Sequence, residues 1–165
     1  MKWRSLEESA AGEDMRPLRE IYAERKKLIE QYVPAARRET YARVVSELKK
    51  KGIAQSAIKE GDKAPEFELK DQDGKLLRSS DLLAAGKLVV CFIRGRWCPF
   101  CIGQLEAMNL IASQIRDAGA QLATISPQTV QQSFFMGDQH KLRFPLLSDT
   151  GNNGCPTVWL GLSGA

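Results

Sequence analysis

The stretch VVCFIRGRWCPFCIGQLEAMN, residues 89–109, places Cys98 and Cys101 between an apolar run and a helical pattern. The run from Leu88 to Ile93 has the length and branched apolar composition of a buried strand. A helix is expected from about Cys98 to Ala118. Its apolar positions are Leu105, Met108, Ile111 and Ile115. The two cysteines therefore fall at a strand-to-helix junction.

Strand and helix patterns alternate on both sides of this junction. A strand pair is expected across the turn at 71–74, a strand at 121–126, a short helix at 128–136 and another strand at 144–149. Such alternation predicts an α/β fold with a parallel βαβ core. We expect one domain over residues 56–165.

An N-terminal arm, residues 1–55, precedes this domain. Pro17 begins a helical pattern that Pro34 interrupts, and a second helix is expected from Ala35 to Lys51, with Gly52 as its stop. Apolar residues form a stripe on each helix. Each stripe must be buried against the main domain, the other helix or a second subunit, so a homodimer is one of the alternatives.

The charge is concentrated in the arm. Residues 1–60 hold 14 Lys/Arg against 10 Asp/Glu, whereas residues 61–165 hold 10 of each. The arm has no regular interleaving of aromatic with basic residues and no motif that recognises nucleic-acid bases. A solvated helical face is therefore favoured over a nucleic-acid site. No apolar run is long enough for a membrane span or a signal peptide, and we expect a cytoplasmic protein without a membrane partner.

The cysteine pair has the surroundings of a reactive thiol. The Cys98 sulfur would lie at the positive end of a helix dipole, beside Arg94 and Arg96, which lowers a thiol pKa from ~8.5 toward ~3.5–7.5. Cys101 is expected to be more buried and less ionised, so that Cys98 attacks and Cys101 resolves. Pro99 and Trp97 complete the candidate site. Pro99 suits the first helical turn, and Trp97 either shields the sulfur or is a core residue.

Two other uses of the pair are weaker. A zinc site would need further ligands from Cys91, Cys155 or His140, and Cys91 falls inside the predicted strand, where buried apolar packing is its simplest role. A structural disulfide would close a very short loop in a reducing compartment. We therefore expect redox chemistry at the cysteines, with no metal and no cofactor.

The segment GDKAPEFELKDQDGKLLRSSDLLAAGKLVVCFIRGRWCPFC, residues 61–101, resembles the peroxiredoxin-like branch of the alkyl hydroperoxide reductase and thiol-specific antioxidant family. The resemblance spans roughly residues 50–153 and implies a thioredoxin-like fold. It also implies that Cys98 attacks a peroxide and becomes a sulfenic acid, that a second thiol condenses with it, and that a thioredoxin- or glutaredoxin-type reductant restores the pair.

Around the two cysteines, this chain departs from the family pattern. Ordinary members carry a proline seven residues and a threonine or serine three residues before the attacking cysteine, where this chain has Cys91 and Gly95. The WCPFC segment, residues 97–101, blends thioredoxin and glutaredoxin motifs, which favours dithiol–disulfide exchange. A thiol peroxidase, a general thiol–disulfide oxidoreductase and a catalytically silent module all stay open at this point.

The third departure is the tail. The family pattern continues with two more strands and a helix after FPLLSDTGN, but this chain reads NGCPTVWLGLSGA. We predict that a one-nucleotide frameshift replaced the native tail, so that the strand carrying the active site lacks one neighbour. In the alternative, a natural short variant, Val158, Trp159 and Leu160 would cover part of the exposed surface.

Overall fold

A mixed five-stranded sheet forms the centre of the protein. The computed structural model describes residues 15–52, 55 and 57–152, and the strand order over these residues is β2-β1-β5-β4-β3. The strands are β1 (Glu68–Lys70), β2 (Leu76–Arg78), β3 (Lys87–Phe92), β4 (Ala120–Ser126) and β5 (Leu146–Ser148). β3, β4 and β5 are parallel, while β1 is antiparallel to β2 and β5. The predicted α/β fold with a parallel core is confirmed.

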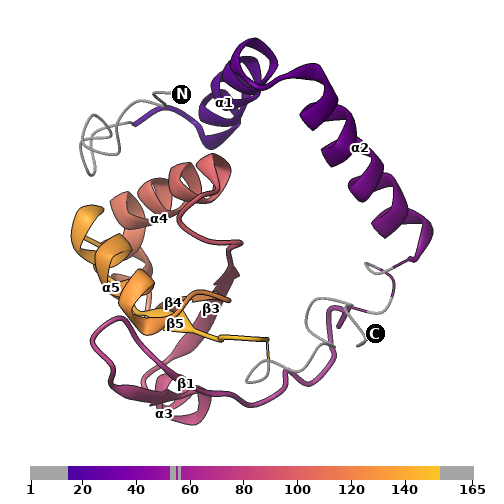
Figure 1. Cartoon of the computed structure of the whole chain (residues 1–165). Helices are drawn as coiled ribbons and strands as arrows, with labels where there is room; N and C mark the ends of the chain where they lie inside the picture. Colours follow the sequence, from indigo (N-terminus) through magenta and orange to yellow (C-terminus); the bar gives the residue numbers. More distant parts are fainter. Residues whose placement is uncertain (1–14, 53–54, 56, 153–165) are drawn as a thin grey trace.

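Helices cover both faces of this sheet (Figure 1). The described helices are α1 (Leu18–Tyr32), α2 (Ala35–Lys50), α3 (Ser79–Ala84), α4 (Pro99–Asp117) and α5 (Val130–Gln139), of which α4 and α5 lie on one face of the sheet and α3 on the other. One apolar cluster joins α4 and α5 to the sheet and includes Leu105, Met136 and Leu146. A second cluster on the opposite face includes Phe67 and Ile125, with Leu82 of α3 packed against it.

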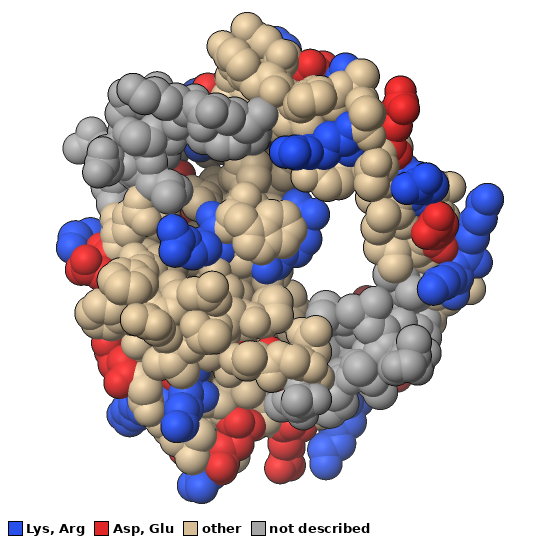
Figure 2. All heavy atoms as spheres, in the orientation of Figure 1, with Lys and Arg blue, Asp and Glu red and all other residues tan. Residues whose placement is uncertain are grey.

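The N-terminal arm divides into a docked helix and an undocked one. α1 packs on α4 where Gly103 leaves room for Ile21, since a Cβ on Gly103 would lie 2.9 Å from the Ile21 Cγ2. α2 has no buried residue, and its predicted stripe leaves Tyr41, Val44 and Val45 exposed. Within this chain α2 therefore buries its stripe neither on the main domain nor on α1, and it lies apart from the central domain (Figure 1); burial against a second subunit stays a prediction. Figure 2 shows open space between α2 and that domain.

Several elements differ from the sequence-based expectations. β3 is half-buried, because it lies at the sheet edge of the described residues and pairs there only with β4. Ile111 of α4 is exposed rather than buried. α5 begins two residues later than expected, because Thr129 and Gln132 form a capping box that fixes its start. The short helix α3 was not predicted at all.

The C-terminal prediction lies outside the described residues. Residues 153–165, including Cys155 and the proposed covering residues Val158 to Leu160, belong to the part of the chain that the structure does not describe. The frameshift therefore remains a prediction. Among the helices that the structure does describe, none combines the length and apolar character needed to cross a bilayer.

Candidate active site

Cys98 and Cys101 lie where β3 ends and α4 begins. Cys98 is the N-cap of α4, and its sulfur accepts the backbone N–H of Cys101 at 3.3 Å, as a serine or aspartate oxygen does at other helices. Pro99 occupies the first turn, where its missing N–H removes no helical hydrogen bond. The predicted junction and the predicted place of Pro99 are both confirmed.

The two sulfur atoms are direct neighbours. The Cys101 thiol donates to the Cys98 sulfur, with 2.7 Å between the two Sγ atoms. The guanidinium of Arg94 donates to the same Cys98 sulfur through its Nη2 atom, at 3.1 Å. The Cys101 sulfur accepts the Arg94 backbone N–H at 3.4 Å. Cys98 is thus surrounded by donors, the arrangement that favours a thiolate.

These contacts separate the acidities of the two thiols. The hydrogen bond from the Cys101 thiol is the largest cause that lowers the pKa of Cys98 to about 5, and the Cys101 backbone N–H and the Arg94 guanidinium lower it further. The same thiol–thiol contact raises the pKa of Cys101, and burial adds to that rise. At neutral pH the pair therefore carries one negative charge, on Cys98.

This separation predicts a simple pH profile. The rate of alkylation of Cys98 by iodoacetamide should rise with pH through a midpoint near 5 and be flat above pH 7, because only the thiolate reacts and its fraction grows as pH passes the pKa. Rapid mixing followed by mass spectrometry of the alkylated peptide measures this rate. A midpoint near 8.5, the ordinary thiol value, would contradict the assignment.

Burial of the pair differs from the expectation. Cys98 is 0% exposed and Cys101 is 6% exposed, so Cys101 is not the more buried of the two. The cause is the N-cap role of Cys98, which turns its sulfur inward over the first turn of α4. Trp97 is 68% exposed, which excludes the core role, and the Arg94 guanidinium lies 5.1 Å from its ring centroid.

The two predicted arginines have different positions. Arg94 reaches the Cys98 sulfur, but no contact of the Arg96 side chain with either cysteine occurs among the described residues. Arg96 instead donates its backbone N–H to Gln128 Oε1 at 2.5 Å. Gln128 was not singled out from the sequence. It lies two residues beyond the end of β4, the strand beside β3, and parallel strands bring their carboxyl ends to one edge, which is the signal that could have identified it.

The arm also reaches this site. Tyr22 of α1 contacts Phe100 edge-on, with ring centroids 5.6 Å apart. Burial raises the pKa of Tyr22, and the nearby thiols Cys101, Cys91 and Cys98 raise it further. Packing of the arm on the main domain was one of the sequence-based alternatives, but the pairing of Tyr22 with Phe100 was not predicted.

Cys91 is half-buried on β3 and is not a simple apolar filler. Its sulfur accepts the amide N–H of Gln104 at 2.9 Å. Burial raises its pKa, and the Gln104 contact opposes that rise. At neutral pH Cys91 is therefore a poor nucleophile beside Cys98.

The residues that could bind a metal do not gather. Over residues 15–52, 55 and 57–152, no group of three or more His, Cys, Asp or Glu side chains is arranged to hold an ion. His140 is buried, with its Nδ1 3.3 Å from a Glu106 carboxylate oxygen. His140 is thus paired with an acid in the α4 and α5 layer and is not near a set of cysteines.

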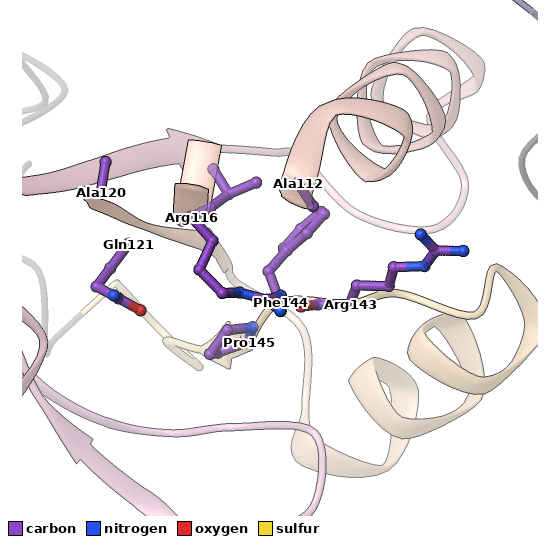
Figure 3. A pocket seen from close by; sticks show the side chains of 8 residues that line it. Ala112, Arg116, Ala120, Gln121, Arg143, Phe144 and Pro145 are labelled. Carbon is purple, nitrogen blue, oxygen red and sulfur yellow. Dashed lines mark hydrogen bonds between the residues drawn. The ribbon is translucent and has the colours of Figure 1, made fainter. Parts of the chain in front are cut away.

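A small cleft lies at the far end of α4 (Figure 3). Its volume is about 50 Å³, and an Nη2 of Arg116 donates to the Arg143 carbonyl at 3.4 Å. The Arg143 side chain points away from the Arg116 side chain (Figure 3). The cleft residues on α4 follow Cys98 by more than three helical turns, roughly 20 Å at the usual rise per residue. This cleft is therefore separate from the cysteine site. Its lining residues are Ala112, Arg116, Ala120, Gln121, Leu122, Arg143, Phe144 and Pro145.

Comparison with known proteins places the cysteine site in a family context. Residues 60–155 match the AhpC/TSA family. The chain is 31% identical to the chloroplastic peroxiredoxin Q of Arabidopsis thaliana over 113 residues, which cover 68% of this chain and 52% of that protein. It is 35% identical to the chloroplastic peroxiredoxin Q of Populus jackii over 96 residues, which cover 58% of this chain and 44% of that protein. The chain thus spans about half the length of these relatives.

The fold agrees with a solved structure. The crystal structure of peroxidoxin BcpB from Mycobacterium tuberculosis superposes with a TM-score of 0.60 at 27% identity, covering 66% of this chain and 69% of that one. The sheet with α4 and α5 therefore has a thioredoxin-like fold of the peroxiredoxin type.

Proposed function

Because the chain belongs to the AhpC/TSA family, we propose that it is a thiol-dependent peroxidase in which Cys98 attacks a hydroperoxide and Cys101 resolves the product. The observation that supports this most directly is the Cys98 sulfur itself. It is fully buried, it has donors from Arg94 and Cys101, and its pKa is lowered to about 5.

The reaction that this geometry supports has two steps on the protein. The Cys98 thiolate attacks one peroxide oxygen, a sulfur–oxygen bond forms and the oxygen–oxygen bond breaks, and the leaving hydroxide or alkoxide takes a proton. Cys101 then attacks the Cys98 sulfenic acid, and water leaves as the disulfide forms. The sulfur atoms are already 2.7 Å apart, so this second step needs little movement.

Arg94 is the proposed electrostatic partner of this chemistry. Gly95 stands where ordinary family members have a hydroxyl residue, so the peroxide loses that contact. Arg94 remains charged at working pH and already donates to the reacting sulfur. We assign to Arg94 the roles of holding the thiolate and stabilising the negative charge that develops on the leaving oxygen.

Burial favours a small substrate over a protein disulfide. With both sulfur atoms nearly inaccessible, a folded protein disulfide cannot approach Cys98 without opening the loop from Arg94 to Cys98. Hydrogen peroxide and small organic hydroperoxides need far less room. General thiol–disulfide exchange is therefore the second candidate, supported by the adjacent CxxC thiols.

One comparison of substrates tests the proposal. Stopped-flow mixing of the fully reduced protein with hydrogen peroxide should oxidise Cys98 at least about a hundredfold faster, at equal concentrations, than mixing with insulin disulfides, because only the peroxide fits the closed site. Thiol counting should find two thiols lost per peroxide. Faster reaction with insulin would favour the oxidoreductase.

Completion of the cycle requires an external dithiol. We propose a thioredoxin- or glutaredoxin-type reductant, which supplies two electrons and two protons to the Cys98–Cys101 disulfide once the loop from Arg94 to Cys98 has opened. A reduced resting pair also suits a reducing compartment such as the cytoplasm.

We further propose that residues 1–55 act as an arm on the redox domain, residues 56–165, anchored through α1.

A further inference from the structure

We propose that Gln128 is a positioning residue for the attacking thiol and that it acts through the peptide bond between Gly95 and Arg96. This inference rests on the proposed role of Cys98. The hydrogen bonds of Gln128 go to Arg96, Ser126, Met136 and Thr150 and not to either cysteine, so it would work by fixing the loop that carries them.

Gln128 is itself firmly held. Its side chain is buried, and its amide N–H lies 3.6 Å from the sulfur of Met136 in α5. Its backbone N–H donates to the hydroxyl of Ser126 at 3.4 Å, and its carbonyl accepts the Thr150 hydroxyl at 3.2 Å. With these contacts at the end of β4, its side-chain oxygen is a fixed acceptor rather than a surface amide.

That acceptor holds one end of a peptide group whose other end binds Cys98. The Arg96 N–H donates to Gln128 Oε1 at 2.5 Å, while the Gly95 carbonyl accepts the Cys98 backbone N–H at 3.0 Å. The Gly95 carbonyl and the Arg96 N–H belong to the same planar unit. Fixing the N–H therefore also fixes the carbonyl, and with it the backbone of the N-cap residue.

Gly95 makes this restraint necessary. It has a φ of +136°, a conformation that glycine adopts easily and can also leave easily. An added Cβ at Gly95 would lie 3.3 Å from Gln128 Oε1 and 3.0 Å from Trp97 Nε1, which shows how closely the loop approaches Gln128. Without the hydrogen bond from the Arg96 N–H to Gln128, the peptide is free to rotate and the Cys98 sulfur loses its fixed place beside Arg94 and the start of α4.

The test is the pH profile of Cys98 alkylation, measured without any peroxide. Gln128→Met keeps a similar volume but removes the acceptor, and it should raise the midpoint by about one pH unit, because the thiolate loses part of its donor set. Hydrogen exchange at the Arg96 and Cys98 amides should accelerate in the same variant. The matched control is Gln131→Met on the exposed surface of α5, which should change neither readout.

Two outcomes would overturn the proposal. One is an unchanged midpoint in a folded Gln128→Met protein, and the other is unchanged exchange at the Arg96 amide. If Gln128→Met does not fold, Gln128→Asn carries the same prediction, since its amide is one methylene too short to reach Arg96. A parent protein that fails to reduce peroxide would sink the proposed function but leave this test intact, because alkylation needs only the thiolate.

Discussion

Replacement of Cys98 by serine should abolish peroxide reduction, lowering the rate of peroxide consumption by at least about a thousandfold, because a serine hydroxyl is not ionised at neutral pH and no other group replaces the nucleophile. The pKa of the Cys98 thiol is lowered to about 5, so the parent protein is almost entirely in its reactive form at pH 7. Stopped-flow measurement of peroxide loss under excess reductant gives both rates directly.

Cys91→Ser is the matched control for this change. Cys91 is half-buried on the adjacent strand, and burial raises its pKa, so it should contribute nothing to the reaction with peroxide. The control protein should therefore react at the parent rate. If Cys98→Ser consumed peroxide as fast as the parent, or if Cys91→Ser were the inactive variant, the assignment of the nucleophile would be wrong.

The parts of the fold that the sequence predicted well are those whose pattern is local. The apolar run before Cys98, the helix after it and the strand at 121–126 are each defined by their own residues, and β3, α4 and β4 begin and end within one or two residues of the expected positions. The same is true of α1 and α2, where Pro17, Pro34 and Gly52 mark the boundaries. The spacing of the apolar residues and the positions of proline and glycine were sufficient to predict these elements.

The parts that it predicted poorly depend on tertiary contacts. The stripe of α2 has the same helical spacing as that of α1, yet only α1 of the two buries a residue, Ile21, where a glycine on α4 leaves room for it. Nothing in either stripe distinguishes the two cases. The apolar composition of β3 did not show its edge position among the described strands, because strand order is set by the whole sheet; that position was expected only from comparison with the family pattern.

The candidate site shows the same division. Cys98, Cys101, Pro99 and Arg94 occupy the places that their spacing indicated. Cys101 was expected to be the more buried of the two cysteines, and the role of Trp97 was left open between shielding and core; both depend on how the loop folds over the helix N-terminus. Gln128, 30 residues beyond Cys98 in sequence, joins the loop only through strand topology.

The thiol–thiol contact gives Cys101 two separable roles, and its replacement should expose both. Cys101→Ala should still react with one peroxide per chain and then stop, because the thiol that lies 2.7 Å from the Cys98 sulfur, and that would form the disulfide, has been removed. Trapping with dimedone and mass spectrometry should find the adduct on Cys98. Steady-state turnover with a dithiol reductant such as thioredoxin should fall by about a hundredfold or more, since the normal disulfide intermediate is missing.

The second role is electrostatic, and comparison of two variants isolates it. The Cys101 thiol is the largest cause of the lowered pKa of Cys98, so Cys101→Ala should move the alkylation midpoint upward. Cys101→Ser keeps a hydroxyl donor and should move the midpoint less, while it is equally unable to form the disulfide. Equal midpoints in the two variants would exclude the thiol–thiol hydrogen bond as the cause of the lowered pKa of Cys98. Turnover at the parent rate in either variant would instead assign the resolving role to another thiol, because a peroxidase cycle through this disulfide cannot proceed without the Cys101 sulfur.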